Sequence, residues 1–427
     1  MARSDAPAPD DPRFVLPRRR LGSFHTIETV LLASTACLLA AVAWPIATGQ
    51  FGADKAPPAS QAQPPADHAA PAAAPTAAPT VAEQPTIQLA LLLDTSSSMD
   101  GLIDQARTRL WNITNALDSA TFKGGRPRLE VAVYEYGNDG ISAEAGHIRL
   151  VVGFTSELDA VSRALFALST GGGSEHAPQA IKRASDELEW RSGEGVLRVL
   201  YVAGNESFQQ GPVAWTTALD GASERGVVVN TVFCGHDQDS DAALWQAVAA
   251  RGRGRHFTID HDARASEVAT PFDEKIGALG VAINGTYLGY GDHGLDGVQN
   301  QMEQDNNSSR SGSSVSRGLS KAAGNYVNPS WDLVDAVTEG VVDLEKVADA
   351  ELPLALQGLD KLGRESFVAS RRAERAAIKA ELAELRTKRE AFLATAVESP
   401  APASLDVAMI TAITEQAQRA GFTLDRR

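Results

Sequence analysis

The chain has few cysteines, few histidines and too little positive charge to balance its acidic residues. Its 427 residues include 2 cysteines, 8 histidines, and 39 lysines and arginines against 54 aspartates and glutamates, which gives a net charge of −15. Two cysteines, Cys37 and Cys234, cannot build a disulfide framework, and no pair of histidines has the spacing of a zinc site. Because a protein needs a basic face to bind phosphates, the charge also argues against nucleic acid as a partner.

Sequence signatures of catalysis are missing as well. The chain has no serine nucleophile elbow and no zinc-protease motif, and its glycine-rich stretch at residues 170–173 lacks the lysine of a phosphate-binding loop. We therefore predict a protein without catalysis of its own, with a metal-dependent hydrolase as the less favoured alternative.

One long apolar run lies near the N-terminus. Residues 30–46 are uncharged and mostly Leu, Ala and Val, and three arginines at 18–20 precede them. This length suits a single transmembrane anchor, which we place at residues 27–48, after a cytoplasmic tail at residues 1–26. Two alternatives remain open: a cleaved signal peptide ending near Ala41-Val42-Ala43, and a lipoprotein cysteine at Cys37, which Ser34 disfavours. All three interpretations export the rest of the chain.

Residues 49–84 are rich in alanine and proline, with Pro57-Pro58 and Pro64-Pro65 among many Ala-Pro steps. Such a composition cannot bury a core and favours the extended polyproline II conformation. We predict a disordered linker that holds the globular part away from the membrane.

Strand-like and helix-like segments alternate between residues 85 and 265. The apolar runs predict strands at 87–94, 129–136, 148–154, 195–203, 227–234 and 256–260, and helical spacing predicts helices at 102–117, 158–168 and 245–250. This alternation predicts an α/β domain with a doubly wound, mostly parallel sheet.

The first predicted strand ends in a cluster of oxygen-bearing side chains. Asp94, Ser96 and Ser98 follow the buried run at alternate positions, at the strand end where open α/β sheets bind ligands. One carboxylate and two hydroxyls form an all-oxygen set suited to Mg²⁺, Mn²⁺ or Ca²⁺. The simpler alternative is that these residues only cap the following helix, since Asp and Ser are common N-caps.

Asp-x-Ser-x-Ser after such a strand resembles the metal-ion-dependent adhesion site (MIDAS) of the von Willebrand factor type A (vWA) domain. The resemblance implies a second loop at residues 169–181, where Glu175 stands in the place of the family's threonine, with Ser174 beside it and Thr170 as a weaker candidate. It also implies an aspartate after a later strand, but Ala203 stands there, so Asn205 or Glu206 is left to compensate.

Four later motifs resemble those of a group of uncharacterised bacterial vWA-containing envelope proteins, over residues 85–418. The motifs lie at residues 203–212, 229–235, 284–291 and 326–336. The resemblance implies a single-pass protein of the bacterial inner membrane, with its globular part in the periplasm or extracytoplasmic space.

Residues 266–427 are predicted to be helical. We expect an exposed turn or mobile loop at 306–315 and helices at 334–362, 365–395 and 405–420, the last folding back on the helical bundle. Ile378, Leu382, Leu385 and Phe392 form an apolar stripe in the predicted helix at 365–395. This stripe favours an antiparallel helical hairpin, and the alternative is a coiled-coil arm for dimerisation or partner docking.

These observations predict a membrane-anchored, extracytoplasmic protein-binding module with a divalent-metal site. The predicted ligands are Asp94, Ser96, Ser98 and either Ser174 or Glu175, and the predicted partner is an unidentified envelope protein. If Glu175 binds the ion, it fills the coordination position that adhesion-type vWA domains leave for a partner's carboxylate. The alternative is a metal-free envelope scaffold that acts through its helical region.

Overall fold

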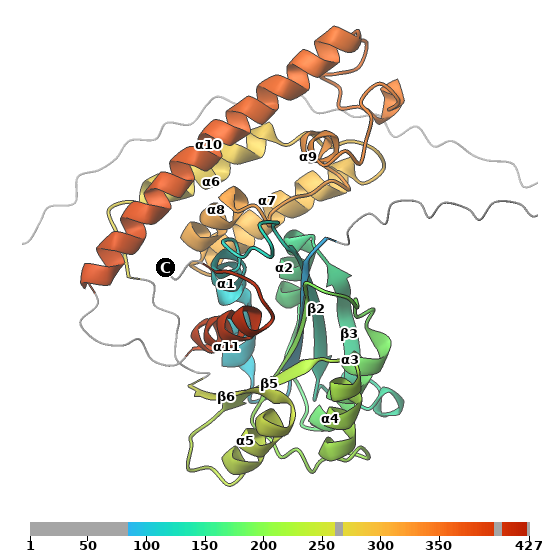
Figure 1. Ribbon diagram of the computed structural model, residues 1–427, viewed down its shortest axis with the longest axis vertical. Coiled ribbons are helices and arrows are strands. Elements are labelled where there is room, and N and C mark those ends of the chain that lie inside the picture. The colour runs from blue at the N-terminus through green and yellow to red at the C-terminus, as the bar shows by residue number, and fades with distance from the viewer. Residues whose placement is uncertain (1–83, 261–267, 397–403, 425–427) are drawn as a thin grey trace, which may run out of the picture. The chain divides into compact units, whose positions relative to one another are not determined.

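The computed structural model describes residues 84–260, 268–396 and 404–424 (Figure 1). The predicted cytoplasmic tail, transmembrane anchor and nearly all of the linker lie outside the described residues. Within the described ranges, no helix is both long enough and apolar enough to cross a membrane. The described residues belong to one compact unit.

The core of this unit is a six-stranded sheet in the order β3-β2-β1-β4-β5-β6, in which only the β2–β3 pair is antiparallel. The strands are β1 (Thr86–Asp94), β2 (Arg128–Tyr136), β3 (Ile148–Thr155), β4 (Val196–Gly204), β5 (Val228–Cys234) and β6 (Arg253–Ile259). All nine residues of β1 are buried, as expected for a central strand with both faces covered. The predicted fold class is therefore confirmed.

Helices cover both faces of the sheet (Figure 1). Alternate residues of β1 point to opposite faces, so that Leu89 and Leu91 pack with one set of helices and Leu92 with the other. The helices are α1 (Asp100–Ala116) and α2 (Leu158–Ala167) on the first face, and α3 (Ala177–Glu187), α4 (Trp215–Glu224) and α5 (Ala242–Arg251) on the second. A short 3-10 helix, η1 (Ala143–Ala145), precedes β3.

The last helix, α11 (Leu405–Arg419), completes the first face of the sheet and lies beside α1 (Figure 1). The Tyr201 hydroxyl on β4 donates to the Met409 carbonyl at 2.9 Å. The buried amides of Asn230 and Gln416 exchange two hydrogen bonds, at 3.2 and 2.6 Å. The prediction that this helix folds back on the helical bundle is wrong, because its apolar face is buried against the sheet and α1.

The residues between β6 and α11 form a helical region. It consists of α6 (Asp273–Ala282), η2 (Ile283–Thr286), α7 (Gly294–Arg310), α8 (Ser314–Ala322), α9 (Leu333–Thr338), η3 (Asp349–Glu351) and α10 (Lys361–Ala396). The helical character predicted for this region is confirmed.

Two local predictions in this region are wrong. The predicted helix at 334–362 is not formed: between α9 and the start of α10 at Lys361 the only helical element is η3. Gly340 and Gly358 take positive φ angles of 70° and 74°, and Pro353 cannot extend a helical hydrogen-bond ladder. An antiparallel hairpin with α10 is therefore not formed. The predicted exposed turn at 306–315 is mostly helix, and Ser308 is fully buried where it accepts a hydrogen bond from the Trp111 indole at 3.1 Å.

The apolar stripe of α10 packs against other residues of the same chain. Leu382 and Leu385 are buried against Ile276 of α6 and Leu319 of α8. Phe392 lies edge-on to Phe272, with 6.5 Å between ring centroids. This packing leaves the buried part of the stripe unavailable as a coiled-coil seam.

A buried ion-pair cluster joins the helical region to the α/β part. Arg317 of α8 is 2% exposed, and its guanidinium pairs with Asp159 of α2 at 2.6 Å and with Asp305 of α7 at 2.9 Å. The same guanidinium stacks over Trp111 of α1, 4.4 Å from the ring centroid. Lys321 donates to Asp305 at 2.6 Å, so two cations and two carboxylates neutralise one another, and of the four side chains only that of Asp305, 17% exposed, reaches the solvent.

Candidate metal-binding site

The candidate site lies where β1 ends, at the point where the chain order of the sheet reverses between β1 and β4. Asp94 is the last residue of β1 and is fully buried. Its Oδ1 accepts a hydrogen bond from the Ser96 amide at 2.7 Å, whereas its Oδ2 is buried with no hydrogen-bond donor. A buried carboxylate oxygen without a donor is costly unless a cation or proton satisfies it.

The two predicted serines stand together beside Asp94. The Ser96 and Ser98 hydroxyl oxygens are 3.3 Å apart, with Ser96 buried and Ser98 exposed. The N-cap of α1 is Met99, and no side chain caps this helix. The capping alternative is therefore wrong, and the hydroxyls are available for another role.

The glycine-rich second loop is bonded to the first through the backbone. The Gly171 amide donates to the Thr95 carbonyl at 2.9 Å, and the Ser97 amide donates to the Gly172 carbonyl at 3.1 Å. Gly172 has a φ of 90°, and a Cβ there would lie 2.4 Å from the Asp139 side chain. Glycine is needed at this position for both its conformation and its lack of a side chain.

The second loop delivers Glu175 to the site. Glu175 is 4% exposed, its side chain interacts with Asp94 and Ser96, and its Oε2 is buried with no hydrogen-bond donor. Its amide donates to the Gln210 side chain at 3.3 Å. Ser174 instead pairs through its backbone with Gly137, and no described hydrogen bond joins its hydroxyl to the site. Thr170, the weaker candidate, donates its hydroxyl hydrogen to Asp100.

The two carboxyl groups have strongly raised pKa values. Burial raises the pKa of Glu175 to about 9, and the charges of Asp94 and Glu206 add to the effect. Burial also raises the pKa of Asp94 to about 6, against hydrogen bonds from Ser96 that act to lower it. Two buried carboxylates that face each other without a cation repel, so the pair favours a bound positive charge.

The third loop contributes an amide where an aspartate was expected. Ala203 has no side-chain oxygen, and its carbonyl accepts a hydrogen bond from the Tyr136 hydroxyl at 2.9 Å. The Asn205 amide nitrogen lies 3.4 Å from the Ser98 hydroxyl, and the Asn205 Oδ1 is buried without a donor. Glu206 accepts from the Gln210 side chain at 3.2 Å and acts on the site through its charge.

Two glycines allow the backbone to approach Asp94 closely. A Cβ on Gly137 would lie 2.7 Å from Asp94 Oδ1, and a Cβ on Gly204 would lie 2.9 Å from Asp94 Oδ2 and 2.4 Å from the Tyr136 hydroxyl. Neither glycine nor Tyr136 was predicted as part of the site. Their roles depend on the register that pairs Asp94 with Tyr136, which a sequence pattern does not specify.

The donor set fits a hard divalent cation. Asp94 and Glu175 each have one buried oxygen without a donor, the hydroxyls of Ser96 and Ser98 lie beside Asp94, and the Asn205 side-chain amide reaches Ser98. Mg²⁺, Mn²⁺ and Ca²⁺ prefer such oxygen ligands. The described residues contain no cluster of three His, Cys, Asp or Glu side chains positioned to hold a metal, so any ion here depends on neutral oxygens for part of its coordination.

A comparison with protein-family models agrees with this fold. A family model of the von Willebrand factor type A domain matches residues 88–271. An aerotolerance-related membrane protein from Bacteroides fragilis is 18% identical, with a TM-score of 0.29 and coverage of 41% of this chain and 93% of that one. Proximal thread matrix protein 1 from the mussel byssus, with a zinc-occupied MIDAS motif, is 15% identical, with a TM-score of 0.31 and 41% of each chain covered.

A third solved structure is the pilus adhesin SpaC from Lactobacillus rhamnosus GG in an open conformation. It is 12% identical, with a TM-score of 0.33 and coverage of 42% of this chain and 28% of that one. No curated protein matches the chain.

Proposed function

Because residues 88–271 of this chain belong to the von Willebrand factor type A domain family, we propose that the chain is a protein-binding module that holds a divalent cation at the end of β1. The cation is Mg²⁺, with Mn²⁺ and Ca²⁺ as close alternatives, and the module has no catalysis of its own. The observation that carries the proposal is that Asp94 and Glu175, from two different loops, interact through their side chains while one oxygen of each is buried without a hydrogen-bond donor.

Each residue of the site has a distinct role in this proposal. Asp94 and Glu175 supply negative charge, Ser96 and Ser98 supply neutral hydroxyl oxygens, and Asn205 supplies an amide oxygen in place of the missing aspartate. A bound divalent cation would offset the repulsion between the two carboxylates. Ser174 was the alternative to Glu175, and Glu175 is preferred because its side chain faces Asp94.

Glu175 makes this a closed site in the proposal. A glutamate from the chain itself takes the coordination position that a partner's carboxylate would otherwise fill, so ligand binding does not need an acidic residue on the partner. Binding of the ion then links the first and second loops. In this proposal the partner binds the surface of the first and second loops, which the bound ion orders.

The test is calorimetric titration of the purified full-length chain with Mg²⁺, Mn²⁺ and Ca²⁺. Asp94→Ala should abolish binding, and Glu175→Thr should weaken it and remove the rise in melting temperature that the metal produces. Asp139→Asn is the matched control, because Asp139 lies near the second loop but its side chain is 58% exposed. An Asp94→Ala variant with unchanged affinity for the metal would refute the proposed metal site. Unchanged affinity in Glu175→Thr, with new binding of acidic peptides, would show an open adhesion site instead.

The cellular setting of the proposal is the bacterial envelope. The predicted anchor at 27–48 would hold the chain in the inner membrane, with the module outside the cytoplasm and an envelope protein as its partner. Self-association into a homo-oligomer is a further expectation. Crosslinking in intact cells identifies the partner, and capture that persists unchanged in EDTA would favour a metal-free scaffold acting through the helical region.

A further inference from the structure

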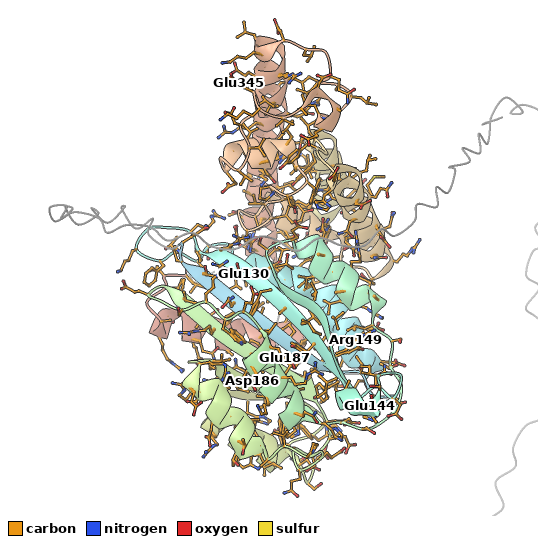
Figure 2. All side chains as sticks on the ribbon, turned by 90° about the vertical axis from the view of Figure 1, so that its right-hand side faces the viewer. Glu130, Glu144, Arg149, Asp186, Glu187 and Glu345 are labelled. Carbon is orange, nitrogen blue, oxygen red and sulfur yellow. The ribbon has the colours of Figure 1, made fainter. Side chains whose placement is uncertain are left out.

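Five segments surround the proposed metal site at one end of the sheet. They are residues 95–100, 137–147, 168–176, 205–214 and 235–241, which follow β1, β2, α2, β4 and β5. Because neighbouring strands of a sheet lie about 4.8 Å apart, these segments form one continuous surface, which we call the metal-site face. Figure 2 shows Glu144 of this face at the end of the sheet opposite Glu130, an early residue of β2.

The metal-site face is rich in acidic residues and has no basic residue to balance them. The five segments contain no lysine or arginine. Six of their carboxylates are exposed to solvent: Asp100, Asp139, Glu144, Glu206, Asp237 and Asp239. A charged surface of one sign steers partners of the opposite sign toward it.

The six exposed carboxylates also lack a basic partner from elsewhere in the described part of the chain, since no lysine or arginine there forms an ion pair with any of them. Asp239 accepts a hydrogen bond from the His236 amide at 2.8 Å, and Glu206 accepts one from a glutamine side chain, so both bonds come from uncharged donors. Asp139 lies 3.8 Å from His147, which is an ion pair only when that histidine is protonated. The acidic charge of the face is therefore unbalanced.

Basic residues of the α/β part lie at the other end of the sheet. Lys123, Arg126, Arg191 and Arg225 occupy the segments that precede β2, β4 and β5. Arg149 is near the metal-site face, but it pairs with the buried carboxylate of Glu135. The acidic face is thus a local feature of the fold, and the net charge of the whole chain does not account for it.

A bound divalent cation would leave this charge in place. The cation would be offset by Asp94 and Glu175, which are buried beneath the face and each have one oxygen without a hydrogen-bond donor. These two oxygens mark the face as a ligand site, and the six exposed carboxylates around it determine the charge of what can dock there.

We propose that the metal-site face binds a segment of another protein that is rich in lysine and arginine. The inference deepens the proposed function and rests on it in one respect, because it takes the surface around the metal site as the surface that the partner contacts. Basic side chains would lie over the exposed carboxylates on both sides of the site, which sets the orientation of the partner. An acidic partner would be repelled, as would a second copy of this chain that met the first face to face.

The test is a titration of the full-length chain, in the presence of Mg²⁺, against a fluorescein-labelled peptide of alternating lysine and serine, followed by fluorescence polarisation. The peptide should bind, and binding should weaken as salt is added. A peptide with glutamate in place of lysine should bind at least about tenfold more weakly. Equal or tighter binding of the glutamate peptide would overturn the proposal.

Two double variants locate the binding while changing the net charge by the same amount. Asp237→Asn with Asp239→Asn removes two charges from the metal-site face and should weaken binding of the lysine peptide about fivefold, with an unchanged melting temperature. Glu274→Gln with Glu303→Gln removes two exposed charges on α6 and α7 that form no described ion pair, and it should bind the peptide as the wild type does. Equal weakening by the two double variants would show attraction to overall charge and would overturn the proposal.

Calorimetry with Mg²⁺ on the same samples separates this proposal from the proposed metal site. The two face variants should keep the wild-type affinity for Mg²⁺, because Asp237 and Asp239 are not among the proposed ligands. Normal Mg²⁺ binding without binding of the lysine peptide would overturn the basic partner and leave the metal site standing. A wild-type chain that binds the lysine peptide at this face but binds no divalent cation would overturn the metal site and support the basic partner.

Discussion

Replacing Asp159 by alanine should destabilise the protein strongly, because it breaks the buried cluster around Arg317. The Arg317 guanidinium is 2% exposed and loses its 2.6 Å partner, and Asp305 is left to neutralise both Arg317 and Lys321. Removing one member of a buried ion pair costs about 3–5 kcal/mol. The lower end applies here, since Asp305 and the rings of Trp111 and Tyr326 still contact the guanidinium.

The measurement is urea unfolding, followed by circular dichroism and by tryptophan fluorescence, to which Trp111 contributes as an internal reporter. Glu384→Ala is the matched control, because the Glu384–Lys388 pair on α10 is exposed. An exposed pair of this spacing contributes only about 0.5 kcal/mol or less. The two variants therefore separate a buried charge from a surface charge on the same scaffold.

A loss below about 1 kcal/mol in Asp159→Ala would refute the argument, because it would mean that water reaches Arg317 in the folded protein. The double variant Asp159→Leu with Arg317→Met tests the reason for the loss. Replacing a buried pair by apolar residues of similar size is often neutral or stabilising, so the double variant should be more stable than Asp159→Ala. If it is less stable, the cluster has a role beyond charge neutralisation.

Three further outcomes follow from the packing and the site. Ile413→Ala on α11 should cost about 2–5 kcal/mol in urea unfolding, because Ile413 is fully buried on the sheet; Val407→Ala, at a position 45% exposed, should cost far less. Gly137→Ala should weaken metal binding, because the new Cβ would lie 2.7 Å from a carboxylate oxygen of the site and φ at this position is 86°. Gly153→Ala is the control, because a Cβ there meets no atom within 4 Å. Equal calorimetric affinities of the two variants for the metal would contradict the prediction. Burial lowers the pKa of His256 below 6.5, so the folded state binds fewer protons there than the unfolded chain does. The contribution of His256 to stability should therefore be complete above pH 6.5 and be lost as the pH falls through the pKa of the folded state. His256→Asn should flatten that part of the profile of stability against pH.

The strands could be predicted because their signal is local. A parallel strand that is buried on both faces is mostly apolar along its length, and β1, β4 and β5 have this pattern. The helix at 405–419 was predicted from its spacing, but the surface that it covers was not. An apolar face on a helix predicts that the face is buried, but it does not predict which surface the face packs against. That surface is set by contacts between residues almost two hundred positions apart, such as Asn230 with Gln416.

The candidate site was predictable to the extent that its residues follow one motif. Asp94, Ser96 and Glu175 come together as expected, and Asn205, named as an alternative, lies at the site through Ser98. The choice between Ser174 and Glu175 required the structure, since neighbouring residues of an extended segment point in opposite directions.

The place of α11 on the sheet has a consequence for how the chain is made. Synthesis runs from the N-terminus, so β4, β5 and β6 exist long before the helix that covers one of their faces. Until residues 405–419 have emerged, an apolar surface of the sheet that later contacts Met409 and Ile413 stays open. The nascent chain therefore depends on residues 405–419 to cover this face of the sheet, and a chain truncated before residue 405 would expose an apolar surface that favours aggregation.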